Sequence, residues 1–263
     1  MSFRLEKIFN SHLSTNRSSC AKYNKDTNSC SASRCVCSAV SEVLSYIDHC
    51  LPSKMNKFEF TDFNGVINGE EIISKTNVGL IMSKISKYCF NNEKLDIGSS
   101  RNLLNSTSCM DKRFSSGTNL IIHGEEKFSN DGIRKKNGKT LLASMVLKEA
   151  IWRRLFKTNR AFTYYYSPMS KIIDDRLTKK ELDMTVSPSN CDWLCIDDIY
   201  DKGKQIQASI LEDVFISRQS KCLPTIYIVK FDASSKADLE TVVGESLSRC
   251  FSGDKNCIII DVS

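Results

Sequence analysis

Hydrophobic positions in the second half of the chain follow two alternating patterns. Short apolar runs predict buried strands, and longer stretches with apolar residues at every third or fourth position predict helices. The predicted strands cover 119–124, 161–166, 193–196, 225–229 and 257–262, and the predicted helices cover 140–155, 171–176, 206–217 and 237–251. Because strands that alternate with helices form βαβ units, the pattern predicts an α/β fold with a mostly parallel sheet.

The first 117 residues have a different pattern. Helical periodicity recurs in 38–51 and 69–91, alternating aromatic residues in 57–63 predict an extended segment, and the polar stretch 92–117 is typical of a linker. We therefore expect a Cys-rich N-terminal module, a helical linker region and an α/β domain. These three parts cover residues 1–55, 56–117 and 118–263.

The composition is that of an ordinary globular protein. Of 263 residues, 41% are hydrophobic and only 4 are Pro and 11 Gly, which excludes collagen-like, proline-rich and strongly disordered chains. No run of about 18 apolar residues exists to cross a membrane, and residues 1–7 lack the apolar core of a signal peptide. We therefore expect a cytoplasmic protein in which the 12 Cys are reduced, as buried hydrophobic residues or metal ligands rather than disulfides. Cys195, Cys250 and Cys257 fall in predicted core elements and need no further role.

The net charge adds little. The 37 Lys and Arg against 31 Asp and Glu leave +6, and the sequence pI is about 8.6. This charge permits binding to nucleic acid, but a solvated basic surface explains it equally well.

Gly138-Lys139-Thr140 lies between a predicted strand and a predicted helix, which is the context of a phosphate-binding loop. Backbone N–H groups at the helix start would hold phosphate oxygens of ATP, Lys139 would reach the β/γ-phosphates, and the Thr140 hydroxyl would bind Mg²⁺. We take Asn137 to Thr140 as the nucleotide-binding residues. The usual first Gly of the motif is displaced, which indicates an insertion at 125–136. The alternative is a surface turn.

Asp197 and Asp198 end the predicted strand 193–196, 58 residues after Lys139. At the carboxyl end of a parallel strand, Asp197 can hold the Mg²⁺ water shell and Asp198 can orient or deprotonate the attacking water. Two alternatives are a strand end with two solvated acids and a metal-dependent nuclease, although the latter needs further acidic ligands that the sequence does not place.

Two arginines lie near the ends of predicted helices. Arg249 lies late in the last long helix and Arg218 directly follows the helix 206–217. Either could act as an arginine finger that neutralises charge on a neighbouring subunit's γ-phosphate, or could be an ordinary surface arginine.

Together these residues resemble the DnaC/DnaI-type replicative helicase loaders of bacteria and phages, a branch of the AAA+ ATPases. The resemblance extends over most of the chain and implies an AAA+ P-loop domain at 118–263. Residues 119–124 and 138–143 resemble the Walker A region, 192–199 the Walker B strand, 216–226 the segment that leads into sensor 1, and 246–249 the Ser-Arg finger.

The N-terminal module also resembles these loaders, which often carry a cysteine knuckle. Cys20, Arg34-Cys35-Val36-Cys37 and Leu51-Pro52 follow in the family's order, but Tyr23 replaces the second knuckle Cys. Cys30 could supply the missing thiolate. Cys20, Cys30, Cys35 and Cys37 would then form a tetrahedral Zn²⁺ site, with His12, His49 or Cys50 as substitutes. The alternative is reduced cysteines without metal.

One departure concerns catalysis. At the sensor 1 position the family usually has Asn, and this chain has Lys230. Lysine can contact a γ-phosphate, but it cannot position water as an amide does. The sequence therefore supports nucleotide binding more firmly than turnover.

The resemblance implies a mechanism. The N-terminal module would grip a replicative ring helicase, and ATPase domains would assemble side by side as a hexameric or spiral homo-oligomer, with Arg249 acting on the next subunit's ATP. The assembly would open the ring for single-stranded DNA, whose phosphates Lys171 and Arg176 could contact. The alternatives are an IstB-type transposition ATPase and a non-hydrolysing zinc-knuckle adaptor with an altered ATP site.

Overall fold

The structure is a computed structural model. The structure describes residues 21–27, 29–30, 65–67, 70–71, 73, 75–90, 113, 115–125, 138–155, 163–179, 186–201, 205–233, 238–253 and 256–262. The predicted helix 38–51, the predicted extended segment 57–63 and most of the insertion 125–136 therefore lie outside the described residues.

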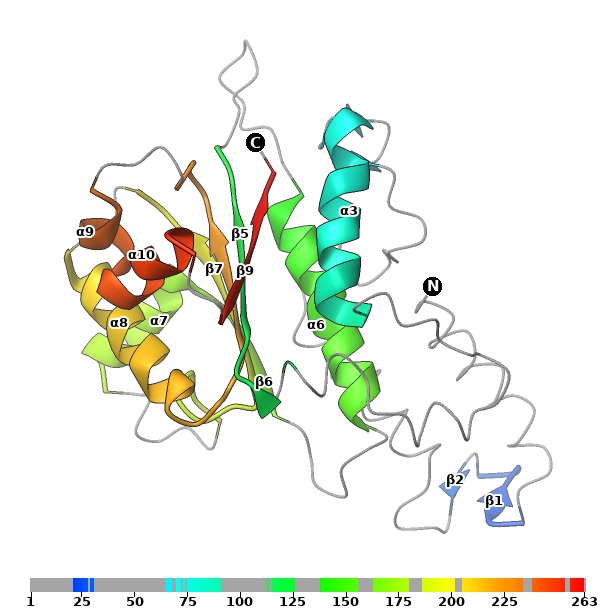
Figure 1. The fold of residues 1–263 in the computed structure, drawn as a ribbon. Coiled ribbons are helices and arrows are strands. Elements are labelled where there is room, and N and C mark those ends of the chain that lie inside the picture. Colours follow the sequence, from blue (N-terminus) through cyan, green and yellow to red (C-terminus); the bar gives the residue numbers. More distant parts are fainter. Residues whose placement is uncertain are drawn as a thin grey trace.

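A five-stranded parallel sheet forms the centre of the described part (Figure 1). The strands are β5 (Asn119–His123), β6 (Tyr164–Pro168), β7 (Trp193–Ile199), β8 (Thr225–Val229) and β9 (Cys257–Asp261), in the spatial order β6-β7-β8-β5-β9. All four neighbouring pairs are parallel. The predicted α/β fold with a parallel sheet is confirmed. Strand β5 is the first of these five strands in the sequence, but it lies between β8 and β9, the last two.

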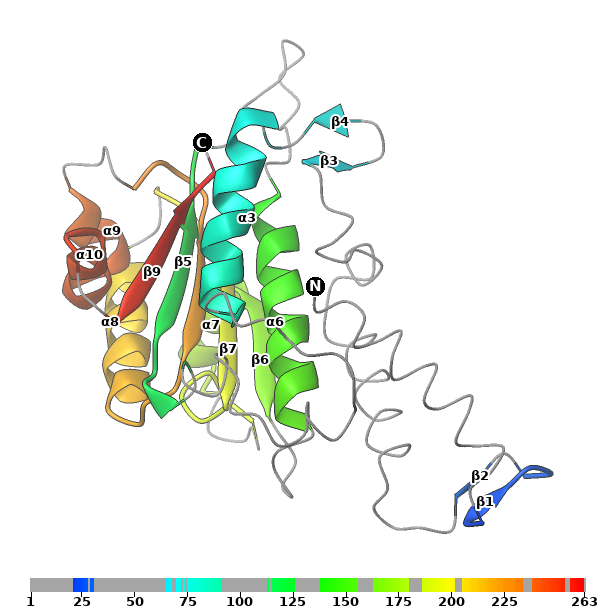
Figure 2. The ribbon, with the colours of Figure 1, turned by 45° about the vertical axis from the view of Figure 1, so that its right-hand side comes forward.

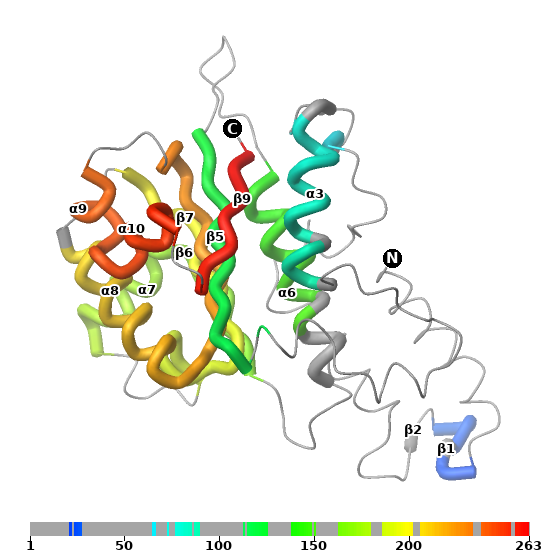
Figure 3. The backbone as a smooth tube through the Cα atoms, viewed as in Figure 1, coloured from blue at the N-terminus to red at the C-terminus, as the bar shows by residue number. Residues whose placement is uncertain are grey.

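Helices cover both faces of the sheet (Figures 1 and 3). One face carries α3 and α6, and the other carries α7, α8, α9 and α10. Their bounds are Lys75–Phe90 for α3, Lys139–Leu155 for α6, Met169–Leu177 for α7, Gln205–Gln219 for α8, Leu239–Val243 for α9 and Glu245–Phe251 for α10. Every residue of β5 and β8 is buried, which explains why these strands read as continuous apolar runs rather than alternating ones. No helix in the described ranges is long and apolar enough to cross a membrane.

Two short antiparallel hairpins complete the described elements. Strands β1 (Tyr23–Asn24) and β2 (Ser29–Cys30) form the first hairpin. Strands β3 (Val66–Ile67) and β4 (Glu70–Glu71) form the second, which Figure 2 shows beside the N-terminal end of α3. Because residues 70–71 pair with β3, the helix predicted over 69–91 begins only at Lys75.

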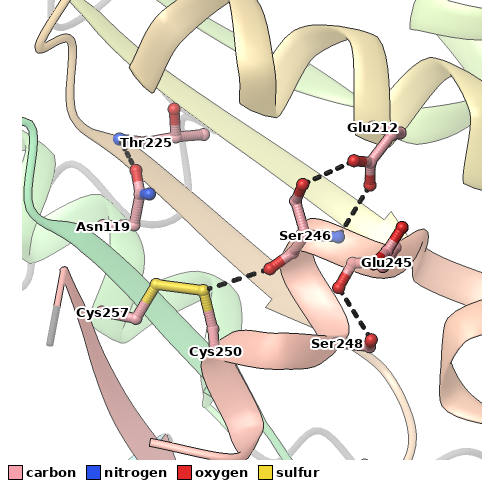
Figure 4. The surroundings of a disulfide bond; sticks show 8 residues. All are labelled: Asn119, Glu212, Thr225, Glu245, Ser246, Ser248, Cys250 and Cys257. Carbon is pink, nitrogen blue, oxygen red and sulfur yellow. Dashed lines mark hydrogen bonds between the residues drawn. A yellow bond between two sulfur atoms is a disulfide. The ribbon is translucent and has the colours of Figure 1, made fainter. Parts of the chain in front are cut away.

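The helix predicted over 237–251 is broken at Gly244. This residue has φ +87°, and a Cβ there would lie 2.7 Å from Glu212 Oε2 and 3.0 Å from the carbonyl oxygen of Ala208 on α8. The break lets α10 approach α8, where the backbone N–H and hydroxyl of Ser246 donate to Glu212 at 2.8 and 2.5 Å (Figure 4). The carboxylate therefore caps the N-terminus of α10.

Replacing Gly244 with alanine should lower the free energy of unfolding by about 1–3 kcal/mol, because the side chain meets both a positive φ and a close neighbour. Gly79→Ala is the matched control, since Gly79 lies in α3 with open space around its Cβ position and should gain about 0.5–1 kcal/mol. Urea unfolding of both variants measures the difference. A Gly244→Ala variant as stable as the wild type would show that the break is not required.

Cys250 of α10 and Cys257 of β9 form a disulfide (Figure 4). Their Cα atoms are 5.8 Å apart, within the usual range for a disulfide. The expectation that all cysteines are reduced is therefore wrong for this pair. The two cysteines are seven positions apart in the chain, at the end of α10 and the start of β9. In the described part, Cys89, Cys191, Cys195 and Cys222 do not take part in a disulfide.

Candidate nucleotide-binding site

The predicted site residues gather at the carboxyl edge of the sheet. Gly124 directly follows β5, Lys139 begins α6, Asp197 and Asp198 lie near the end of β7, and Lys230 directly follows β8. In open α/β sheets, this edge is where ligands bind.

Lys139 and Thr140 form the first turn of α6, as the phosphate-loop pattern requires. Gly138 precedes them with φ +70°. Lys139 is only 1% exposed, and its ammonium donates to the carbonyl of Gly124 at 2.5 Å, so that it lies beside the end of β5. The N–H groups at the start of a helix have no intrahelical acceptor and favour anions. Asn137, the fourth predicted nucleotide-binding residue, lies outside the described residues.

A direct contact joins the two motifs. The Thr140 hydroxyl donates to Asp197 Oδ2 at 2.7 Å across 57 positions of sequence. The structure therefore brings the residues predicted at 138–140 and 197–198 together at one place.

Lys230 lies at the centre of this cluster. Its ammonium contacts Asp197 Oδ1 at 3.0 Å, Asp198 Oδ1 at 3.3 Å and Thr140 Oγ1 at 3.1 Å. Its backbone N–H donates to the carbonyl of Ile199 at 2.8 Å, which ties the residue to the end of β7. The Lys230 side chain is 9% exposed, so these contacts are made away from bulk water.

Tyr166 is a site residue that the sequence analysis did not identify. Its hydroxyl donates to Asp197 Oδ2 at 2.6 Å from the neighbouring strand β6. Burial, together with the charge of Asp197, raises the pKa of Tyr166, so the phenol keeps its proton and remains a donor. The signal for it was the position of a tyrosine near the carboxyl end of a strand predicted to lie in the same parallel sheet.

An irregularity in β7 lets the successive carboxylates of Asp197 and Asp198 both contact the ammonium of Lys230. In a regular strand, neighbouring side chains point to opposite faces. Here the pairing of β7 with β8 shifts register between Ile196 and Ile199, and Asp198 has φ +60°. Asp197 is buried, while the Asp198 side chain is 41% exposed and also accepts from Tyr200 at 3.3 Å. Asp198 is therefore the carboxylate of the pair that solvent can reach.

Four groups surround the carboxylate of Asp197. Its Oδ1 forms an ion pair with the ammonium of Lys230 at 3.0 Å and accepts from the backbone N–H of Asp198 at 2.6 Å. Its Oδ2 accepts from the hydroxyls of Thr140 and Tyr166. Mg²⁺ needs free oxygen ligands in near-octahedral geometry. The Mg²⁺ role predicted for Thr140 and Asp197 therefore does not fit the arrangement that Lys230 imposes.

The two candidate arginine fingers lie in opposite environments. Arg249 is 71% exposed on α10 and pairs with Glu245 one turn earlier. Arg218 is 1% exposed and donates to the Thr225 hydroxyl and to the carbonyls of Pro188, Cys191, Asp192 and Pro224. Arg218 is therefore neither a finger nor a surface residue, and of the two only Arg249 can reach a neighbouring molecule.

The remaining predicted sites are less defined. Lys171 is exposed on α7, while Arg176 on the same helix pairs with Asp213 at 3.2 Å. Cys20, Cys35 and Cys37 of the predicted Zn²⁺ site lie outside the described residues, and Cys30 is described only as part of β2. The described residues contain no cluster of His, Cys, Asp or Glu that could hold a metal ion.

No family model and no curated protein matches this chain. Similar solved structures include a DNA replication initiation factor (14% identity, TM-score 0.46, 79% of this chain), the DnaC helicase loader (15%, 0.46, 72%) and DnaI (12%, 0.45, 81%). The matches cover 92% of both loaders but only 50% of the initiation factor, so the chain spans about half the length of the latter. These scores are too low to carry an argument about function. The similar structures nevertheless include DnaC and DnaI, the loader type that the sequence motifs resemble.

Proposed function

We propose that this chain binds ATP at the carboxyl edge of its sheet and loads a replicative ring helicase onto single-stranded DNA during replication. The observation that carries the ATP site is the 2.7 Å contact between Thr140 and Asp197, which joins a helix-start Gly-Lys-Thr to a pair of strand-end carboxylates. This combination is the one on which phosphoryl-transfer proteins of the P-loop type depend.

Each residue of the site has a task in this proposal. The N–H groups at the start of α6 and the ammonium of Lys139 hold the phosphates. Asp198, the more exposed carboxylate, orients or deprotonates the attacking water. Arg249 projects from α10 toward the ATP of the next subunit in a hexameric or spiral assembly, where its charge stabilises the transition state.

The helicase and DNA parts of the proposal rest on the motif resemblance. The Cys-rich module 1–55, with its Zn²⁺ ligands Cys20, Cys30, Cys35 and Cys37, would hold the helicase. Lys171 is exposed on α7 and would contact DNA phosphates, while Arg176 would first have to leave Asp213. Cytoplasmic location belongs to the same proposal.

A second candidate function is a non-hydrolysing adaptor that binds ATP without turning it over. The favouring observation is Lys230, whose ammonium contacts both Asp197 and Asp198. A carboxylate oxygen that already contacts an ammonium has less capacity to accept from the attacking water.

An ATPase assay with and without single-stranded DNA tests the proposal and separates the two candidates. For a loader we expect DNA-stimulated turnover that Asp198→Asn abolishes. Turnover no greater than in Asp198→Asn, together with intact ATP binding, would favour the adaptor. Co-purification of the tagged chain with a replicative helicase tests the partner, and a preparation that never retains the helicase would count against loading.

Replacing Arg249 with alanine should leave ATP binding unchanged and reduce turnover in the assembly by about 10³-fold or more, because a finger acts only on the transition state of its neighbour. Glu245→Ala is the matched control, since it removes the pairing partner on the same helix turn and leaves the arginine in place. Turnover rates and binding constants are measured on the same preparations. Full turnover in Arg249→Ala would exclude the finger role.

A further inference from the structure

The ammonium of Lys230 occupies a position among oxygens that would otherwise suit a cation. Its three partners come from two elements: Asp197 and Asp198 from β7, and Thr140 from α6, at 3.0–3.3 Å. A lysine ammonium has three protons to donate and no acceptor. The ammonium donates to Thr140 and forms ion pairs with both carboxylates, so three oxygens from two elements surround it.

The donors around these oxygens are also consistent with one another. Thr140 donates its only proton to Asp197, and its oxygen accepts from Lys230. Asp197 accepts from Thr140, from the phenol of Tyr166 and from the backbone N–H of Asp198, and it pairs with Lys230. The oxygens of Asp197 and Thr140 therefore have partners within the protein, and buried polar groups with partners are stable where unpaired ones are not.

A divalent cation would conflict with this arrangement. Mg²⁺–oxygen bonds are about 2.1 Å long, so an ion on the Thr140 hydroxyl would lie within about 5 Å of the Lys230 nitrogen. At a largely buried site such like charges repel strongly. Moving the Lys230 ammonium away would break its hydrogen bond to Thr140 and its ion pairs with both carboxylates.

We propose that Lys230 takes the place of the divalent cation at this site, so that the chain binds ATP without Mg²⁺. The ligand recognised is then the free nucleoside triphosphate. Its negative charge is met by Lys139 and the N-terminus of α6, while Lys230 offsets the charge of the two carboxylates. This proposal rests on the proposed ATP site, but it does not depend on whether ATP is hydrolysed.

Calorimetric titration of ATP into the full chain tests the proposal, once in buffer with MgCl₂ and once with EDTA. The wild type should bind with dissociation constants that agree within about threefold, whereas Lys230→Met should bind at least about tenfold more tightly with Mg²⁺ than with EDTA. Lys221→Met is the matched control: Lys221 is exposed, contacts the carbonyl of Ser189 and should behave as the wild type.

The outcomes distinguish the role of Lys230 from the existence of the ATP site. Wild-type binding that is lost in EDTA overturns the role of Lys230 and leaves the ATP site intact. No binding in either buffer overturns the ATP site and the role of Lys230 with it. If Lys230→Met does not fold, as thermal melting would show, the wild-type pair of titrations still decides, because equal binding in the two buffers supports the proposal.

Discussion

Replacing Lys139 with alanine should weaken ATP binding by about one to two orders of magnitude. A charge-assisted hydrogen bond to a phosphate contributes about 1.5–3 kcal/mol, and its loss at a buried site removes most of the attraction for the phosphates. Lys139 begins α6 and is 1% exposed, so its contact with a phosphate would be shielded from bulk water. Titration calorimetry with ATP measures the change directly.

The control for this prediction is Lys148→Ala. Lys148 is also buried in α6, at 7% exposure, but lies two turns beyond the helix start. Loss of a buried lysine from this helix is common to both variants, whereas loss of the phosphate contact belongs to Lys139→Ala alone. Normal ATP binding by a folded Lys139→Ala protein would refute the assignment of 138–140 as the phosphate loop.

The largest effect on stability should come from Arg218→Ala. The guanidinium donates to four carbonyl oxygens (Pro188, Cys191, Asp192 and Pro224) and to the Thr225 hydroxyl, and its removal takes this donor from all five acceptors. Each buried acceptor left unpaired costs about 1–3 kcal/mol, and part of this loss is recovered by relaxation. We expect the free energy of unfolding to fall by about 4 kcal/mol and Tm by roughly 10 °C in thermal melting.

Arg176→Ala provides the comparison for this effect. Arg176 forms an exposed ion pair with Asp213, and exposed pairs contribute about 0–1 kcal/mol. Arg218→Lys should recover only part of the loss, because an ammonium has three donors and lacks the planar fork of the guanidinium. An Arg218→Ala protein that melts as the wild type does would show that the network adds nothing to stability.

The order of elements in the second half could be predicted from the sequence because its signals are local. Five apolar runs and the amphipathic stretches between them gave the strands and most helices, and Gly138-Lys139-Thr140 marked the start of α6. The break at Gly244 was missed because its cause is not local. The glycine is required by Glu212 and Ala208, more than thirty positions earlier in the chain.

The composition of the site was only partly predictable for the same reason. Asp197, Asp198 and Lys139 stand out by residue type and position, but the meeting of Lys230 with Thr140 depends on strand order, which places β8 between β5 and β7. Tyr166 depends on the register of β6 against β7. Neither order nor register is encoded in a short motif.

The attachment of α10 has a consequence for assembly. Glu212 holds the start of this helix to α8, and the disulfide of Cys250 joins its other end to β9. Arg249 therefore lies on a helix that is attached to the rest of the domain at both ends. Such a helix moves with the domain as a rigid body, so in an assembly of such subunits the angle between adjacent subunits would set the distance from the guanidinium to a neighbour's nucleotide. Any change in the curvature of the ring would then also change the access of the arginine to that nucleotide.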